Sequence, residues 1–222
     1  MAKVIIGIPC MDSVSTSFFS SILGQEYTAG DLYSYGIEVG SMVYTARGRI
    51  ANSAINRSAD VLVFYDSDMI LEPDTTTKLV NHIVKGGKDF VSGIYFKRNP
   101  NTEPLILKEL DWYSGDDMIY GPQETAIIYE DYPKDTVFEI AGCGFGVCAM
   151  SVEMLKQVTV ASKMNPFTPL PRLSEDYSFC FRARQAGYKL WCDSTIKTGH
   201  AGLKVYTEAD WERLKEARKQ NG

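Results

Sequence analysis

The sequence lacks the features typical of membrane-spanning proteins, of secreted proteins and of small proteins stabilised by a bound zinc ion. It contains no run of about 18 apolar residues, so we expect no membrane span. The opening segment, MAKVIIGIPC, lacks the apolar core and cleavage site of a signal peptide. The five cysteines form no C-x-x-C pair, which disfavours a zinc site or a disulfide framework. We therefore expect a cytoplasmic protein with reduced, mostly buried cysteines.

An excess of charge of one sign is also missing. Lysine and arginine number 23 against 28 aspartate and glutamate residues, which gives a net charge of −5. This balance argues against a broad footprint on nucleic acid, although the basic pair Lys97-Arg98 and the basic tail leave such a partner open. With 222 residues, 45% of them hydrophobic, the chain suits one domain with a substantial core.

The hydrophobic pattern predicts alternating strands and helices. Near-continuous apolar runs at 3–8, 61–65 and 90–96 are typical of strands buried on both faces. Helical spacing follows at 44–57, and a further helix is expected from Pro73 to the glycines at 86–87. This alternation predicts an α/β fold with a mostly parallel sheet.

The stretch 98–135 breaks this pattern. It is rich in Asp, Glu, Tyr and Pro, and only 105–107 and 126–129 look strand-like. We interpret it as a small antiparallel insertion or edge hairpin. Beyond it, strand-like residues at 137–150 and a helix at 174–186 resume the pattern. No linker divides the chain, so 1–222 is expected to form a single domain.

A pair of aspartates stands directly after the second buried run. Ligands of parallel α/β sheets bind at the carboxyl ends of the strands, and this run ends in Asp66-Ser67-Asp68. Alternate carboxylates there suit a divalent cation that bridges phosphate oxygens. Aspartates that merely cap a turn would look the same, so the motif alone is weak.

Two later features strengthen the functional interpretation. Glu175 and Asp176 open a helix, where they either complement the helix dipole or face a cleft. His200, one of two histidines, stands between glycines in a predicted loop, as a metal ligand or as a structural residue.

Taken together, these motifs resemble the GT-A glycosyltransferases of the family 2 type. The likeness covers nearly the whole chain except about 98–135. The residues that carry it, in chain order, are Ala46-Arg47, Asn52, ADVLVFYDSD at 59–68, Pro73, VSGIY at 91–95, GCGF at 142–145, SED at 174–176, GY at 187–188 and His200.

The resemblance implies a single GT-A, Rossmann-like domain that transfers a sugar from a nucleoside-diphosphate sugar to a hydroxyl group. It implies a nucleotide-binding half at 1–97 and an acceptor-binding, catalytic half at 136–222. By this likeness Asp66, Asp68 and His200 would hold Mn²⁺ or Mg²⁺, and an imidazole ligand suits Mn²⁺ better.

The resemblance also implies roles for residues around the donor and acceptor. Asp176 would be the general base of an inverting displacement, with Glu175 orienting the acceptor or raising the basicity of its neighbour. The remaining donor-binding candidates are Pro9, Asp12, Arg47, Asp66, Gly144 and Arg172. UDP is the default nucleotide, and GDP stays open.

Two alternatives compete with this interpretation. An apolar strand followed by D-x-D also resembles haloacid-dehalogenase phosphatases, in which the first aspartate, here Asp66, accepts a phosphoryl group. That motif normally lies close to the N-terminus. The other alternative is a module that binds a nucleotide sugar without turnover. For a glycosyltransferase, the acceptor could be a saccharide, a protein, a small molecule or a hydroxymethylated nucleobase.

Overall fold

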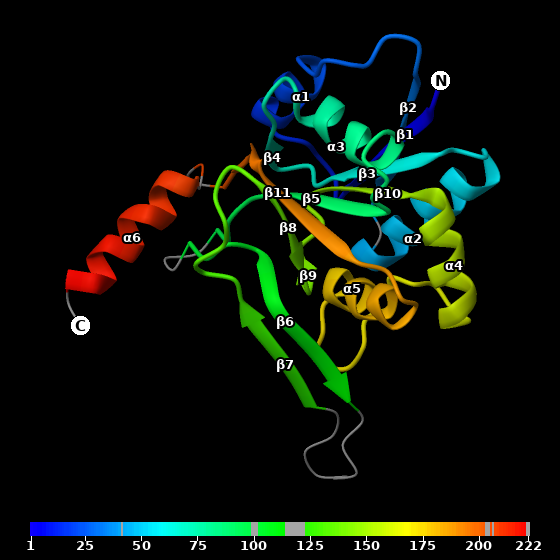
Figure 1. Cartoon of the computed structure of the whole chain (residues 1–222). Coiled ribbons are helices and arrows are strands. Elements are labelled where there is room, and N and C mark those ends of the chain that lie inside the picture. The colour runs from blue at the N-terminus through cyan, green and yellow to red at the C-terminus, as the bar shows by residue number, and fades with distance from the viewer. Residues whose placement is uncertain (41, 99–101, 114–122, 203–204, 206, 221–222) are drawn as a thin grey trace.

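The computed structural model describes residues 1–40, 42–98, 102–113, 123–202, 205 and 207–220. A seven-stranded sheet lies at its centre, in the order β2-β1-β3-β10-β5-β11-β8 (Figure 1). These strands are β1 (Lys3–Cys10), β2 (Leu32–Val39), β3 (Val61–Tyr65), β5 (Phe90–Ile94), β8 (Val137–Ile140), β10 (Val147–Ser151) and β11 (Leu190–Lys197).

Most strands of this sheet run in one direction. Strand β1 is parallel to both β2 and β3, and β11 is parallel to β5. Strand β10 runs antiparallel between β3 and β5, and β8 is antiparallel to β11. The predicted α/β class with a mostly parallel sheet is therefore confirmed. Strands β3 and β5 come before 98–135 in the chain and β10 comes after it, yet β10 lies between them, so both parts of the chain form one sheet.

Helices cover both faces of the sheet. Alternate residues of a strand point to opposite faces, so Ile5 and Leu62 pack with α2, α4 and α5, while Ile6 and Val63 pack with α1 and α3. Figure 1 shows these helices on the two sides. The helices are α1 (Thr16–Leu23), α2 (Val43–Asn56), α3 (Thr75–Val84), α4 (Val152–Ser162), α5 (Glu175–Gln185) and α6 (Glu208–Gln220).

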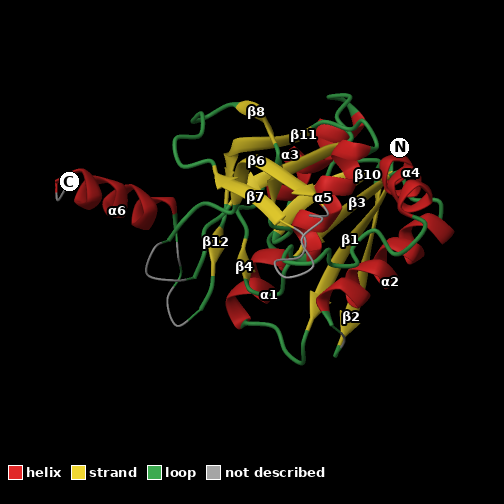
Figure 2. Ribbon diagram, turned by 90° about the horizontal axis from the view of Figure 1, so that it is seen from below, coloured by secondary structure: helices red, strands yellow, loops and turns green. Residues whose placement is uncertain are grey.

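Two small antiparallel sheets complete the fold. The first has the order β7-β6-β9, from β6 (Ile106–Tyr113), β7 (Gln123–Ile128) and β9 (Gly142–Cys143). Its hairpin extends away from the main sheet (Figure 1), as the predicted antiparallel insertion requires. The second joins β4 (Met69–Ile70) to β12 (Gly199–His200), and Figure 2 shows this pair beside the main sheet.

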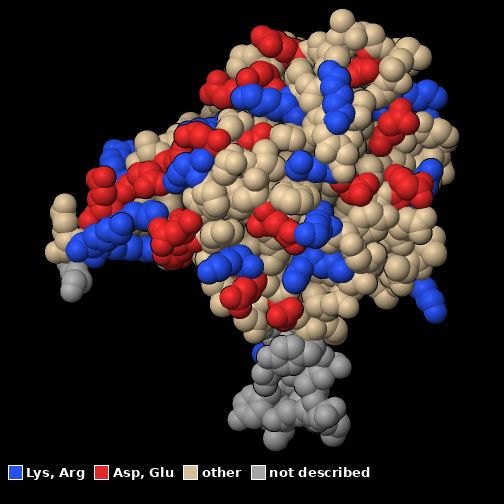
Figure 3. All heavy atoms as spheres, in the orientation of Figure 1, with Lys and Arg blue, Asp and Glu red and all other residues tan. Residues whose placement is uncertain are grey.

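The cysteines, the helices and the surface charges can each be compared with what the composition predicts. All five cysteines are buried and unpaired, as expected. In the described part of the chain, no helix is both long and apolar enough to cross a membrane. On the face shown in Figure 3, acidic and basic side chains are interspersed. That face therefore presents no continuous basic surface.

Candidate active site

The D-x-D turn lies at the carboxyl end of β3, in the middle of the sheet. All of β3 is buried, and its last residue is followed by Asp66, whose backbone N–H donates to the Gly146 carbonyl at 3.1 Å. Strand β4 then pairs with β12, which places His200 opposite Met69. A bond of 2.8 Å from the Ala201 N–H to the Asp68 carbonyl fixes this arrangement. Sheet pairing thus brings the late histidine beside the second aspartate.

The side chains of Asp68 and His200 face each other. The His200 Nε2 atom lies 3.6 Å from Asp68 Oδ1, which is buried and has no hydrogen-bond partner among the described residues. His200 Nδ1 lies 2.7 Å from the Phe96 carbonyl oxygen, which can only accept a hydrogen bond, so Nδ1 is the donor and carries the proton. In the neutral imidazole, Nε2 therefore directs a lone pair toward the carboxylate.

Two facing electron-pair donors suit a bound cation. An imidazole nitrogen and a carboxylate oxygen match the ligand preference of Mn²⁺, so this donor set fits the expected metal. Burial raises the pKa of Asp68, but the positive charges of His200 in its protonated form and of Arg98 outweigh burial, so this pKa lies below its usual value. In the described ranges, no cluster of three or more metal-ligating side chains forms. The fit therefore rests on Asp68 and His200.

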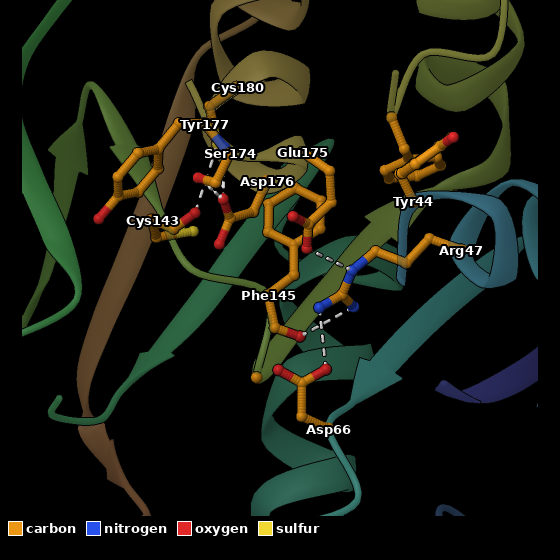
Figure 4. Close-up of polar contacts among 12 residues, drawn as sticks. Tyr44, Arg47, Asp66, Cys143, Phe145, Ser174, Glu175, Asp176, Tyr177 and Cys180 are labelled. Carbon is orange, nitrogen blue, oxygen red and sulfur yellow. Dashed lines mark hydrogen bonds and ion pairs between the residues drawn. The ribbon is translucent and has the colours of Figure 1, made fainter. Parts of the chain in front are cut away.

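Asp66 is directed toward Arg47 on α2. The Arg47 side chain is only 2% exposed, and its Nη2 lies 2.8 Å from Asp66 Oδ1. Its Nε lies 3.3 Å from Glu175 Oε1, and its Nη1 donates to the Phe145 carbonyl at 3.4 Å. Figure 4 shows this guanidinium between the two carboxylates. Arg47 thus joins the end of β3 to the start of α5.

The charge of Arg47 is retained in spite of its burial. Burial lowers the pKa of this guanidinium, but the neighbouring Asp66 and Glu175 raise it by a larger amount, so the net shift of the pKa is upward. The guanidinium carbon also lies 5.2 Å from the centre of the Phe64 ring. Aromatic stacking and ion pairing therefore hold a permanent cation beneath the D-x-D turn.

Asp176 lies in the first turn of α5 and is half-buried. Ser174 Oγ and the Tyr177 N–H both donate to its Oδ1 atom, and the latter bond is 2.8 Å long. Burial raises the pKa of Asp176 to about 6, with a further contribution from Glu175. A carboxyl group with this pKa is ionised at neutral pH, yet basic enough to take up a proton.

Gly144 and Gly146 let the backbone pack against Tyr95, and Gly144 also lies close to Asp176. A Cβ atom on Gly144 would collide with the Tyr95 hydroxyl and would lie 3.4 Å from Asp176 Oδ2. The Tyr95 hydroxyl accepts a hydrogen bond of 3.0 Å from the Gly146 N–H. Only glycine fits at position 144 without displacing Tyr95.

A cleft of about 210 Å³ lies between these groups. The carboxyl ends of β1 and β3 and the start of α5 form its walls, in agreement with the general position of ligand sites in such sheets. Its lining residues are Pro9, Cys10, Met11, Val43, Ala46, Arg47, Asp66, Ser67, Asp68, Glu175 and Asp176.

The cleft brings together most, but not all, of the predicted site residues. Gly144 and His200 lie beside it, next to Asp176 and Asp68 respectively. Asp12 is exposed, accepts a bond of 3.1 Å from the Ser13 hydroxyl and does not line the cleft. Arg172 is exposed, has a φ of +69° and does not line it either.

Sequence reasoning missed part of the apolar lining of this cleft. Met11 and Val43 carry no charge and belong to no motif that would single them out. Their positions directly after β1 and in the first turn of α2 were the available signal, because both segments end at the ligand-binding edge of the sheet. Sequence reasoning also assigned no role at this site to Arg98, which lies beside Asp68.

A family model described as Glycosyl transferase family 2 matches residues 51–159 of the chain. The matched segment includes β3, the D-x-D turn, β5 and β10. A comparison with curated proteins gave no match.

Several solved structures have a similar fold. A197 from STIV is 18% identical with a TM-score of 0.62, over 93% of this chain and 94% of that one. GalNAc-T7, crystallised with UDP, GalNAc and Mn²⁺, is 10% identical with a TM-score of 0.55, over 97% of this chain and 48% of that one. The chain thus spans about half of GalNAc-T7. A CMP:2-keto-3-deoxy-manno-octonic acid synthetase complexed with CTP is 12% identical with a TM-score of 0.51, over 100% of both chains.

These findings confirm the resemblance inferred from the motifs. The chain has a GT-A fold similar to that of family 2 glycosyltransferases. The family match supports a glycosyltransferase activity. The structural likenesses, at these identities, show the fold alone, and the roles of individual site residues stay predictions.

Proposed function

We propose that the protein is a metal-dependent glycosyltransferase that transfers a sugar from a nucleoside-diphosphate sugar to an acceptor hydroxyl with inversion. One observation carries the proposal. A single cleft at the carboxyl ends of β1 and β3 combines the aspartate pair of the D-x-D turn with Asp176, a carboxyl group whose pKa is about 6. Diphosphate binding and proton abstraction could therefore occur side by side.

The donor would bind across β1, β3 and the start of α2. Pro9 and Asp66 lie at this edge, and Arg47 supplies a buried positive charge beneath it. GalNAc-T7 was crystallised with UDP and the synthetase with CTP, which supports a pyrimidine nucleotide, with UDP as the first choice. Asp12 and Arg172 lie on loops outside the cleft, so a part in donor binding would require those loops to move.

Asp68 and His200 would hold the divalent cation, with Mn²⁺ preferred. GalNAc-T7 was crystallised with Mn²⁺, and the facing Oδ1 and Nε2 atoms are the ligand types that this ion accepts. When bound, such a cation offsets the negative charge that develops on a departing nucleoside diphosphate. Asp66 would act from its ion pair with Arg47, as a contact to the ribose or to the cation through water.

Asp176 would be the general base. As the acceptor oxygen forms its bond to the anomeric carbon, the bond from that carbon to the diphosphate oxygen breaks, and the acceptor proton passes to Asp176. Both hydrogen bonds that the described residues make to this carboxylate go to Oδ1, so Oδ2 is the atom assigned to the proton. Glu175 contributes by raising the pKa of its neighbour.

The chain would act as one unit in this reaction. Residues 1–97 would bind the nucleotide, and 136–222 would supply the base and the acceptor surface. The acceptor would be a saccharide, a protein, a small molecule or a hydroxymethylated nucleobase. The net charge of −5 argues mildly against a nucleic-acid polymer as the acceptor.

A nucleotide-release assay tests the proposal. The purified protein is incubated with UDP-, GDP- and dTDP-sugars, with Mn²⁺ or with EDTA, and with extracts of each acceptor class. Release from one donor that depends on Mn²⁺ and increases with an acceptor supports the proposal. Asp176→Asn, which keeps the size of the side chain, is the matched control and should bind the donor without transferring sugar.

Two other outcomes would contradict the proposal. Phosphate release from a phosphomonoester, without donor turnover, would favour the phosphatase alternative, although the ion pair of Asp66 with Arg47 does not suit a nucleophile. Donor binding without release under any acceptor condition would favour the non-catalytic module.

A further inference from the structure

Arg98 occupies the position next to the expected cation site. Its Nη1 atom lies 2.8 Å from Asp68 Oδ2 and donates to the Ala201 carbonyl at 3.0 Å. The carboxylate of Asp68 is thus shared between this guanidinium and the imidazole of His200. In the described structure, a side-chain cation thus already pairs with one oxygen, Oδ2, of the carboxylate that a divalent cation would need.

The backbone before Arg98 is anchored, so its side chain is the part that can move. Phe96 pairs with Pro104, and the Lys97 N–H donates to the Glu103 carbonyl at 2.9 Å. The Lys97 ammonium forms its own ion pair with Glu103, at 2.8 Å. The Arg98 side chain, in contrast, is 43% exposed and can rotate about its flexible stem.

A guanidinium and a divalent cation would repel each other at one carboxylate. When a cation binds to Asp68 and His200, Arg98 loses its carboxylate partner and gains a positive neighbour. The diphosphate of a bound donor would be the anion nearest to Arg98, because it would bind to the same divalent cation. Guanidinium groups bind phosphate oxygens in a bidentate geometry, so the diphosphate is the natural next partner.

We propose that Arg98 is an exchangeable cation of the donor site. It neutralises Asp68 in the free protein and moves to the donor diphosphate once a divalent cation has taken its place. The inference rests on the proposed function for the identity of the anion, but the competition at Asp68 does not depend on it. Arg98 would therefore weaken binding of the free metal ion and strengthen binding of the nucleotide.

The first arm of the test measures Mn²⁺ binding without nucleotide. Mn²⁺ is titrated into the wild type, Arg98→Met and Lys97→Met, and bound metal is measured by calorimetry and electron paramagnetic resonance. Arg98→Met should bind Mn²⁺ about fivefold more tightly, the size expected when a partly exposed ion pair is removed. Lys97→Met, which removes the same charge one residue away, should differ much less from the wild type.

The second arm measures binding of UDP and GDP at saturating Mn²⁺. Arg98→Met should bind the preferred nucleotide at least about fivefold more weakly, and Arg98→Lys should recover part of the loss. Tighter Mn²⁺ binding together with weaker nucleotide binding would indicate exchange, since a general loss of folding would weaken the binding of both ligands. Thermal melts in EDTA check that all variants are folded.

Each contrary result bears on a different step. Mn²⁺ binding that is unchanged or weaker in Arg98→Met overturns the competition at Asp68. Unchanged nucleotide binding in Arg98→Met overturns the transfer to the diphosphate. Absence of Mn²⁺ binding in the wild type overturns the whole inference. If the wild type bound no Mn²⁺ but still turned over the donor in EDTA, the protein would be a glycosyltransferase that does not depend on a metal.

Discussion

The two aspartates of the D-x-D turn each pair with an arginine, and the two pairs lie in different surroundings. Arg47 reaches Asp66 from α2, is 2% exposed and is held by Glu175 and the Phe145 carbonyl as well. Arg98 reaches Asp68 from the end of the β5 segment and is 43% exposed. Residues two positions apart in the sequence therefore have a fixed partner and an exchangeable partner.

This difference teaches how one short motif can serve two purposes. A buried ion pair contributes little net stability, but it is costly to break, because the remaining charge is left without solvent. A partly exposed pair is worth about 0–1 kcal/mol and can be exchanged easily. Arg47 is thus suited to hold the end of β3 against the start of α5, and Arg98 is suited to be displaced by a ligand.

Removal of Arg47 should have the largest effect on stability. Arg47→Met keeps much of the side-chain volume but leaves the carboxylates of Asp66 and Glu175 without their shared cation. We expect the free energy of unfolding to fall by about 3 kcal/mol at pH 7.5, together with loss of donor turnover. Urea denaturation followed by circular dichroism measures the change.

Arg98→Met is the matched control for that experiment. It removes the same functional group from the other aspartate of the D-x-D turn, at a partly exposed position. Its free energy of unfolding should therefore stay within about 1 kcal/mol of the wild type. Equal losses in the two variants would remove the distinction between a fixed and an exchangeable pair.

Asp176→Asn should have the next largest effect, on chemistry rather than folding. Without a proton acceptor, the rate of transfer should fall by at least about a hundredfold, while donor affinity changes little. In the wild type, the rate at saturating substrate should rise with pH through about 6, as Asp176 loses its proton. A rate that is flat between pH 5 and 8 would argue against this base.

The same substitution should also change the pH dependence of stability. The pKa of Asp176 is raised from 3.8 to about 6 by burial and by Glu175. The folded state therefore favours the protonated carboxyl, and that contribution is present below pH 3.8 and is lost as the pH rises through 6. Asp176→Asn should raise the free energy of unfolding by about 1–2 kcal/mol at pH 7.5.

At pH 4 or below, that gain should largely vanish, because Asp176 is then protonated in the folded state. Chemical denaturation of the wild type and the variant at both pH values measures the difference. A gain that is equal at the two pH values would mean that burial of the charged carboxylate is not its cause.

Much of the central sheet could be predicted from the sequence. The apolar runs that became β1, β3 and β5 are buried on both faces, and such strands leave a continuous hydrophobic signal. The edge strand β2 was missed because Ser34, Gly36 and Glu38 interrupt its apolar residues, so it has no continuous hydrophobic run. Helices α1 and α4 were also missed. The Ser15 and Ser151 hydroxyls that cap their N-termini were the available signals.

Most residues that gather at the site could be predicted from the sequence, but the pairing of their side chains could not. Motif order placed Asp66, Asp68, Asp176 and His200 at one end of the sheet, since strand ends meet there. Which carboxylate faces which cation depends on side-chain directions set by packing between distant segments. Arg47 and Glu175, for example, are 128 residues apart, and sequence spacing cannot show that they meet.

The most direct test of the account is pulsed electron paramagnetic resonance of the protein with Mn²⁺ and UDP. One bound Mn²⁺ should couple both to an imidazole nitrogen and to the phosphorus of the diphosphate. In His200→Gln the nitrogen coupling should disappear. Phosphorus coupling without a nitrogen signal in the wild type would mean that the metal and nucleotide do not meet at Asp68 and His200. That result would contradict the donor site described here.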